Sequence, residues 1–191
     1  MSAQSLHRST TELLTGWQAP DPHQDSLRHT VLAFLAAAPR GCLRESAAGH
    51  ITASTIVINA ARTHVLLTLH PRVGKWIQLG GHCEDTDETI ADVATREARE
   101  ESGIAGLDVV PELVQIHTHP ITCSLGVPTR HLDLRFAAFA DDNADGSLPA
   151  IVRSDESVDL DWWPIDALPE NTEHPAIPAL IDAALSAASG R

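Results

Sequence analysis

The sequence predicts an α/β fold preceded by an N-terminal helical extension. Segments rich in Val, Ile, Leu and Thr begin at His50 and recur as far as Trp163, which is typical of β-strands. An amphipathic helix interrupts them near the middle of the chain, and an apolar helix over Ala176–Ala188 follows the last one. The 191 residues are enough for one ordinary domain and an extension. We therefore expect the extension over residues 1–48 and the α/β domain over residues 49–191.

The extension is predicted to consist of two helices. The first covers Ser5–Trp17 and is broken near Pro20 and Pro22, and the second covers Asp25–Ala38. In the second helix, apolar residues recur at helical spacing: Leu27, Val31, Leu32 and Leu35. Three functions stay open for the extension, namely packing on the sheet, a homodimer contact, and shaping of a substrate pocket. Packing is the interpretation that we favour.

The strands are predicted in pairs around the central helix. His50–Asn59 and His64–His70 are separated by four residues, which favours a hairpin, and Trp76–Leu79 is a short strand that leads into a tight turn at Gly80-Gly81. The remaining predicted strands are Leu107–Thr118 (as one or two strands), Arg130–Ala140 and Val158–Trp163. Loops are expected at Pro120–Thr129 and Asp141–Pro149.

The central helix has clear signals at both ends. Thr89 is a good N-cap, and Asp92 three residues later completes a capping-box-like pair. Gly103 is suited to the left-handed position that ends many helices. The sequence therefore predicts a helix from Thr89 to Ser102.

Three carboxylates crowd together on this helix. Glu97, Glu100 and Glu101 lie at i, i+3 and i+4, in the last turns, where the helix dipole disfavours negative charge. Like charges raise each other's pKa and cost stability unless a cation lies among them. Arg96 is an i, i+4 partner for Glu100 and can neutralise one carboxylate. The carboxylates that Arg96 does not neutralise indicate a site for a hard divalent cation such as Mg²⁺ or Mn²⁺.

The same residues resemble the signature of the Nudix hydrolases, G-x5-E-x7-R-E-U-x-E-E-x-G-U, where U is a bulky aliphatic residue. The matching positions are Glu88, Arg96, Glu97, Glu100, Glu101, Gly103 and Ile104. There are two departures, because Gly81 lies one residue too far from Glu88 and Ala98 replaces the larger aliphatic residue. An extra residue in the loop before the helix is tolerated more easily than one inside an element. The resemblance extends over roughly residues 50–168.

The resemblance implies a Nudix-type α/β/α sandwich, with a mixed sheet between the signature helix and the closing helix. It also implies a Mg²⁺- or Mn²⁺-dependent pyrophosphohydrolase that cleaves a diphosphate linkage in a nucleoside diphosphate derivative, of nucleotide, nucleotide-sugar or dinucleotide type. The implied metal ligands are Glu97, Glu100, Glu101 and the backbone carbonyl of Gly81. Arg96 is expected to hold the carboxylates in place without touching the substrate.

Further site residues are expected in the loops. In Nudix enzymes, an acid shortly before a Trp-bearing strand is often the general base or an extra metal ligand, which implies Glu156 first and Asp155 second. Arg72 and Lys75 are candidate phosphate contacts, and Trp76 can either stack on a base or belong to the core. His82, next to the glycine pair, is a candidate for hydrogen bonding to substrate.

The spacing of five histidines gives little support to a zinc site. His70, His82, His117, His119 and His131 contain no pair with the helical H-x-x-x-H spacing. His117 and His119 would share one face of a strand, which permits joint binding of a metal without requiring it.

Charge and cysteine content exclude other classes. The net charge of −13 disfavours a nucleic-acid or anionic-membrane surface and suits a protein that holds metal and a metal-complexed phosphate. The three cysteines, Cys42, Cys83 and Cys123, have no C-x-x-C spacing, so neither a disulfide framework nor a zinc knuckle is indicated. The sequence shows no signal-peptide run and no long apolar segment, so we expect a cytoplasmic protein.

Two alternatives stay open beside hydrolysis. A prenyl-diphosphate isomerase of the same fold uses a Cys and a Glu, and His119-Pro120 followed by Cys123 is faintly similar to that arrangement. A non-catalytic nucleotide-sensing module often loses signature acids, whereas all three helix glutamates are present here. The complete set of acids favours hydrolysis.

Overall fold

The computed structural model describes residues 2–122, 126 and 128–189. The helices and strands in chain order are α1 (Ser2–Gly16), α2 (Pro22–Ala37), β1 (His50–Asn59), β2 (His64–Leu69), β3 (Trp76–Ile77), β4 (Leu79–His82), α3 (Ile90–Ser102), β5 (Val109–Thr122), β6 (Pro128–Ala140), β7 (Asp159–Pro164) and α4 (Ala176–Ser189). None of the described helices is both long and apolar enough to cross a bilayer.

The strands form one mixed, seven-stranded sheet. Its main path runs β3-β2-β1-β6-β5, while β4 also pairs with β1 and β7 with β2. The central β1–β6 pair is parallel, and the other pairs are antiparallel. The predicted α/β class, the hairpin of β1 and β2 and the mixed sheet are therefore confirmed.

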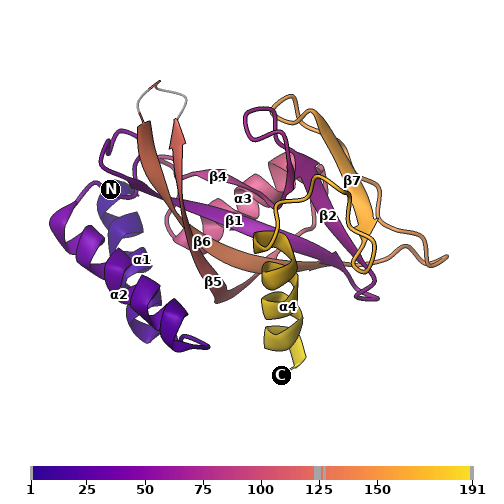
Figure 1. Ribbon diagram of the computed structural model, residues 1–191, viewed down its shortest axis with the longest axis horizontal. Helices are drawn as coiled ribbons and strands as arrows, with labels where there is room; N and C mark the ends of the chain where they lie inside the picture. The colour runs from indigo at the N-terminus through magenta and orange to yellow at the C-terminus, as the bar shows by residue number, and fades with distance from the viewer. Residues whose placement is uncertain (1, 123–125, 127, 190–191) are drawn as a thin grey trace.

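The side chains of β1 alternate between two faces of this sheet. Ile51 and Ala53 belong to a hydrophobic cluster with α3, whereas Ile56 and Ile58 belong to a cluster with α4. In Figure 1, α4 accordingly crosses in front of the sheet and α3 lies behind it. This arrangement confirms the predicted α/β/α sandwich. Thr52 lies on the same face of β1 as Ile56 and Ile58, and it lines an open cavity that is described below.

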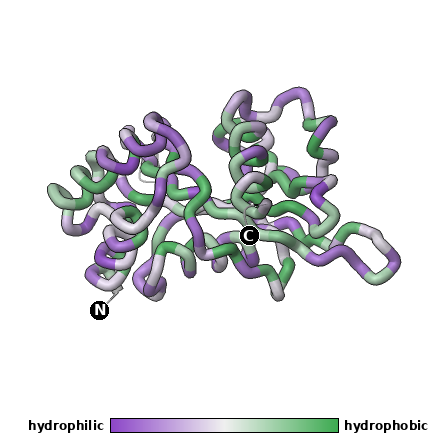
Figure 2. Tube along the Cα trace, turned by 90° about the horizontal axis from the view of Figure 1, so that it is seen from below, coloured by the Kyte–Doolittle hydropathy of each residue, from purple (hydrophilic) through white to green (hydrophobic). Residues whose placement is uncertain are grey.

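The N-terminal helices pack against the rest of the protein. Leu14 and Leu35 are buried in the same hydrophobic cluster as Ile51 of β1. The indole N–H of Trp17 also donates to the carbonyl of Leu113, at 2.6 Å. Along both helices, hydrophobic residues alternate with hydrophilic ones, as expected for elements that pack through one side (Figure 2). The predicted boundary at residue 49 remains a prediction.

The second helix begins earlier than the sequence pattern indicated. Asp21 is its N-cap and accepts hydrogen bonds from two backbone N–H groups, and Pro22 occupies the first turn. Proline is suited to that position because it has no N–H to leave unpaired. Pro22 therefore starts α2 instead of separating two helices.

The predicted turn at Gly80-Gly81 was wrong, because both glycines lie in β4 and pair with β1. Gly80 has φ = 145°, and a Cβ at this position would lie 2.5 Å from the carbonyl oxygen of Ala53. Glycine is required for this close approach of two strands.

The predicted loop Pro120–Thr129 is shorter than expected. β5 runs on to Thr122 and β6 begins at Pro128, so that the two strands pair almost to their ends. Cys123 lies outside the described residues.

Candidate active site

Helix α3 is held at both ends as the sequence predicts. The backbone N–H of Asp92 donates to Thr89 Oγ1 at 3.2 Å, and the backbone N–H of Thr89 donates to Asp92 Oδ2 at 2.9 Å. Gly103 adopts a left-handed conformation, φ = 71°, and its N–H donates to the carbonyl of Arg99. These caps fix the beginning and the end of the helix, and the three glutamates lie in its last turns.

Two of the three glutamates are buried between α3 and β4. Glu97 and Glu101 are 9% and 8% exposed, whereas the side chain of Glu100 is 60% exposed. Glu101 Oε2 accepts a hydrogen bond from the backbone N–H of Gly80 at 2.9 Å. A Cβ on Gly81 would lie 2.6 Å from Glu97 Oε1, so the missing side chain makes room for this carboxylate. The glycines and glutamates therefore form one site.

Burial shifts the protonation of both acids. It raises the pKa of Glu97 to about 7, although the adjacent Arg96 guanidinium acts in the opposite direction. Burial likewise raises the pKa of Glu101 to about 8, although the N–H of Gly80 acts to lower it. The charge of Glu156 adds to the increase at both residues. Two carboxylates held apart from water in this way favour a bound cation or bound protons.

The donor set fits a hard divalent cation. It contains the carboxylate oxygens of Glu97, Glu100 and Glu101, and the backbone of Gly81 lies beside the first of these. Oxygen ligands of this kind suit Mg²⁺ or Mn²⁺. A cation there would also offset the repulsion and burial that raise the two pKa values.

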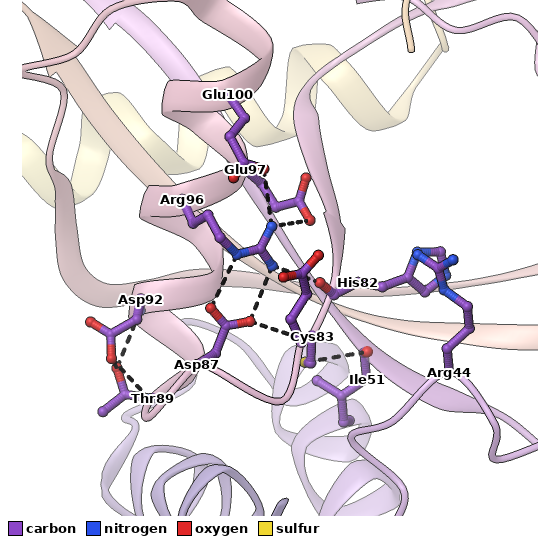
Figure 3. Close-up of polar contacts among 11 residues, drawn as sticks. Arg44, Ile51, His82, Cys83, Asp87, Thr89, Asp92, Arg96, Glu97 and Glu100 are labelled. Atoms are coloured by element: carbon purple, nitrogen blue, oxygen red, sulfur yellow. Dashed lines mark hydrogen bonds and ion pairs between the residues drawn. The ribbon is translucent and has the colours of Figure 1, made fainter. Parts of the chain in front are cut away.

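Arg96 joins the acids of the helix to the preceding loop (Figure 3). Its Nη1 donates to Glu97 at 2.9 Å and to Glu100 at 3.1 Å. Its Nε and Nη2 donate to the two carboxylate oxygens of Asp87, each at 3.1 Å, and Nη2 also donates to the carbonyl of His82 at 2.9 Å. All five of these hydrogen bonds hold groups of the site in place, which is the arrangement expected of a positioning residue.

Sequence analysis overlooked Asp87. Its carboxylate is buried and also accepts from the backbone N–H of Glu84 at 2.7 Å, whereas Glu88, the residue matched to the signature, is exposed. Counting forward from Gly81 instead of backward from Arg96 places Asp87 at the signature's acidic position. The extra residue therefore follows this acid instead of preceding it.

The glutamate site opens into a cavity of about 440 Å³ on the α4 side of the sheet. Its lining includes several of the predicted site residues, namely Arg72, Gly81, His82, Glu101, Asp155 and Glu156. The structure thus brings together the helix acid, the candidate general bases and one candidate phosphate contact.

Lys75 and Trp76, two further candidates for substrate contacts, lie away from the cavity. Neither of them is among the described residues that line the cavity. Trp76 is 7% exposed and packs edge-to-face on Trp163, with 5.3 Å between the ring centroids, in the cluster beneath α4. Its contacts are those of a core residue, so we do not retain Trp76 as a substrate contact.

The floor of the cavity is a buried polar network that sequence analysis also missed. Arg135 Nε donates to Asp133 Oδ2 at 2.8 Å, and both residues are buried. Thr52 and Ser54 donate to the same carboxylate, at 3.0 and 2.8 Å. Burial acts to raise the pKa of Asp133, but Arg135 and these hydrogen bonds hold it below its ordinary value. The signal in the sequence was the alternation of polar residues along two strands with buried apolar neighbours.

Comparison with known proteins identifies the family of the chain. The model of the NUDIX domain family matches residues 49–183, most of the chain, and the protein belongs to this family. None of the proteins with curated descriptions matches the sequence significantly.

Several solved structures are similar to the chain. An Ap4A hydrolase from C. elegans, in a binary complex, is 18% identical with a TM-score of 0.53, and the alignment covers 74% of this chain and 98% of that one. A NUDIX-family hydrolase from Clostridium perfringens is 23% identical with a TM-score of 0.52, covering 70% and 95%. The E. coli dihydroneopterin triphosphate pyrophosphohydrolase is 19% identical with a TM-score of 0.52, covering 69% and 92%. At these identities the likeness shows the fold alone.

The family match confirms the predicted resemblance and the assignment of the protein to the Nudix hydrolases, enzymes that act on phosphoric anhydride bonds. The substrate, the metal and the roles of individual residues remain predictions.

Proposed function

We propose that the protein is a Mg²⁺- or Mn²⁺-dependent pyrophosphohydrolase that cleaves a diphosphate linkage in a nucleoside diphosphate derivative. The observation that carries this proposal is the pair of buried acids, Glu97 and Glu101, beside the glycines of β4 at the edge of a polar cavity. Burial of the two carboxylates costs stability in spite of their contacts with Arg96 and Gly80, because it raises the pKa of both, and a bound cation would offset this cost.

In this proposal Glu97, Glu100 and Glu101, with the carbonyl of Gly81, hold the divalent ion. When bound, such an ion neutralises phosphate oxygens and lowers the pKa of a water molecule. Arg96 is bonded to Asp87 and to two of the glutamates, and so keeps the carboxylates oriented.

Glu156 is the general base that we propose, and Asp155 is the alternative. Both line the cavity, and the charge of Glu156 affects the pKa of Glu97 and Glu101. A carboxylate there accepts a proton from water as the water oxygen attacks one phosphorus. The anhydride P–O bond then breaks, and a phosphate or nucleotide leaves.

Arg72 is the proposed contact for the phosphate groups that are not attacked. It lines the same cavity, and a guanidinium is suited to phosphate because it donates two parallel hydrogen bonds. His82 lines the cavity as well and remains a candidate hydrogen-bond donor to substrate.

The test is release of phosphate, pyrophosphate or nucleotide from a panel of compounds. The panel contains nucleoside triphosphates, dinucleoside polyphosphates, nucleotide sugars, ADP-ribose, NADH and, following the names of two structural neighbours, Ap4A and dihydroneopterin triphosphate. Each is assayed with Mg²⁺, with Mn²⁺ and with EDTA, and Glu101→Gln is the blank. Metal-dependent release from one class, absent in the blank, supports the proposal and names the substrate class.

No release from any compound of the panel would contradict the proposal and favour the two alternatives, the prenyl-diphosphate isomerase and the nucleotide-sensing module. Incorporation of deuterium from heavy water into a prenyl diphosphate would indicate the isomerase. Tight binding of a nucleotide without turnover would indicate the sensing module. The cytoplasmic location, a homodimer and the absence of nucleic-acid and membrane partners also remain predictions.

A further inference from the structure

Three histidines from three different strands meet at one end of the cavity. The ring centroids of His50 and His82 lie 5.1 Å apart, those of His50 and His131 4.9 Å apart, and those of His82 and His131 5.0 Å apart. Their ring nitrogens include a set, one from each residue, that lies within 4.8 Å of one another. We propose that His50, His82 and His131 form a second metal site, for a divalent transition-metal ion such as Zn²⁺, separate from the glutamates of α3.

The pairing of the strands brings these residues together. His50 of β1 and His131 of β6 are direct partners in the parallel pair, so their side chains project from the same face of the sheet. His82 of β4 pairs with Thr52, two residues along β1 on that face. The three side chains are therefore mounted on hydrogen-bonded backbone, which is the kind of rigid support that a metal site needs.

The spacing of the rings matches a shared ion. With metal–nitrogen bonds of about 2.1 Å and tetrahedral angles, the centroids of two ligating imidazoles lie about 5.3 Å apart and their nitrogens about 3.4 Å apart. The observed centroid distances of 4.9–5.1 Å are already close to this value. The ring nitrogens lie within 4.8 Å of one another, so the most distant pair has to approach by at most about 1.4 Å to reach the spacing of a shared ion.

Two of the three histidines have a buried nitrogen with no hydrogen-bond partner. These atoms are His50 Nε2 and His131 Nε2, and the two residues are 1% and 9% exposed. Buried polar atoms are nearly always paired, and an unpaired one calls for an explanation. An ion between the rings accounts for both atoms at once.

The other nitrogen of His50 has the contact that metal-ligating histidines usually make. His50 Nδ1 lies 3.3 Å from the carbonyl oxygen of Ser46, which can only accept a hydrogen bond. Nδ1 therefore carries the hydrogen in the neutral ring, and Nε2 keeps the lone pair that binds metal. A backbone carbonyl commonly fixes the tautomer of a ligating histidine in this way.

The ligand type sets the class of ion. Three imidazoles and no carboxylate suit Zn²⁺, Co²⁺, Ni²⁺ or Cu²⁺ better than Mg²⁺, which prefers oxygen. His82 and His131 both line the cavity, so an ion held by the triad presents its remaining position to the cavity, where water or a phosphate oxygen can bind. Arg44 Nη2 now lies 3.1 Å from His82 Nδ1, and this exposed cation has to turn away when the ion enters.

The experiment uses the full chain without a polyhistidine tag. The protein is stripped with EDTA, returned to excess Mg²⁺ and titrated with Co²⁺, whose visible absorption is intense in sites of low coordination number. We expect a stoichiometric band that Zn²⁺ abolishes by competition. His82→Gln and His50→Gln should each weaken Co²⁺ binding by at least about tenfold.

Matched variants give the test its specificity. His23→Gln replaces an exposed histidine on α2 and should bind Co²⁺ as the unsubstituted protein does. Glu101→Gln, which removes a ligand of the Mg²⁺ site, should also keep the band. The experiment therefore tests the histidine site independently of the proposed hydrolase site. His82 is only half-buried, so its variant tests the site even if His50→Gln does not fold.

Three results would overturn the proposal. The first is no band with the unsubstituted protein, the second is a band that survives both His50→Gln and His82→Gln, and the third is a band lost in Glu101→Gln. Added pyrophosphate should change the Co²⁺ spectrum through the position that faces the cavity. An unchanged spectrum would overturn that open position.

Discussion

The carboxylate of Glu101 accepts a hydrogen bond from the backbone N–H of Gly80, 2.9 Å away, and this contact ties helix α3 to strand β4. It holds one oxygen of the acid in place, while its burial raises the pKa of the carboxyl to about 8. Its acidic neighbours add to this increase. One residue therefore has a structural contact and an unfavourable charge at the same time, and substitution can separate the two.

Glu101→Gln should abolish most activity and keep the fold. The amide oxygen still accepts from Gly80, while the charge that holds the divalent ion is lost. We expect turnover to fall by about 100-fold or more, because the ion supplies several kcal/mol of transition-state stabilisation. Metal-dependent product release measures the loss of activity, and thermal unfolding in EDTA shows whether the fold is kept. Equal turnover in the variant and the unsubstituted enzyme would remove Glu101 from the metal site.

Asp87→Asn should disturb the site through Arg96. The carboxylate of Asp87 is buried and pairs with two nitrogens of the guanidinium, so its loss should cost about 1–3 kcal/mol of stability and lower kcat. Glu88→Gln, at the next residue, is the control, since Glu88 is exposed and should tolerate the change. Denaturant unfolding measures the stability of both variants, and steady-state kinetics measure their kcat. The reverse ranking would restore Glu88 as the acid of the signature.

The elements with strong local signals were predictable from the sequence. Helix α3 has a capping box and a terminal glycine, and β1 is rich in Ile, Val and Thr, so each signal lies within the element itself. The identity of the acid that pairs with Arg96 was not predictable, because an extra residue in a loop leaves its register open. The sequence predicts a turn at the glycines of β4 because the partner strand that makes them extended lies far away in the sequence.

The histidine triad was not predictable from the sequence, because it too depends on pairing between strands that are distant in the sequence. His50 and His131 are neighbours only through the parallel pairing of β1 with β6, and a search for ligands at helical spacing does not detect a site built across a sheet. The buried pair of Asp133 and Arg135 likewise depends on which strand lies beside which. Local patterns predict elements, whereas these sites arise from non-local pairing.

Arg72→Gln and Lys75→Gln should have different effects on substrate binding. Arg72 lines the cavity, while Lys75 is exposed and is not among the described lining residues. Loss of a charge-assisted hydrogen bond to phosphate should raise KM about tenfold for Arg72→Gln, and KM should stay nearly unchanged for Lys75→Gln. Steady-state kinetics with the substrate that the panel identifies measure both. Equal KM values for the two variants would show that Arg72 does not contact the phosphates.

Glu156→Gln should lower kcat with little change in KM, because a general base acts in the transition state and not in binding. General-base catalysis contributes about 10²–10⁴-fold, which sets the size of the expected loss. Asp155→Asn, the adjacent acid of the same cavity, is the matched variant and should lose much less. A larger loss in Asp155→Asn would exchange the two roles. Retained binding of Co²⁺ and Mg²⁺ by both variants would show that neither substitution acts through a metal.

The stability of the metal-free protein should fall as pH rises above about 7.5. Burial raises the pKa of Glu97 to about 7 and that of Glu101 to about 8, well above the values of these acids in an unfolded chain. The folded state therefore binds more protons than the unfolded state, and the free energy of unfolding decreases with pH until both carboxyls are charged. The loss should be complete above the folded pKa of Glu101.

The histidines act in the opposite direction and fix the pH window of the experiment. Burial lowers the pKa of His82 to about 3 and that of His131 to about 4, so these groups make stability rise with pH up to the unfolded value of about 6.5. An unfolded histidine is still about a quarter charged at pH 7, and burial also lowers the pKa of His50, His70, His117 and His119, so the histidine contribution ends only above about pH 7.5. Above that pH the carboxyls make stability fall, together with the thiols of Cys42 and Cys83, whose pKa burial raises.

Thermal unfolding in EDTA over that window should show a falling Tm. Glu101→Gln should reduce the slope, because one titrating carboxyl is gone. Saturating Mg²⁺ should oppose the fall, since the ion binds the charged carboxylates of the folded state and stabilises it more as pH rises. A Tm that is flat between about pH 7.5 and about pH 8.5 in EDTA, or a slope unaffected by both Mg²⁺ and Glu101→Gln, would contradict the raised pKa values and the cation site built on them.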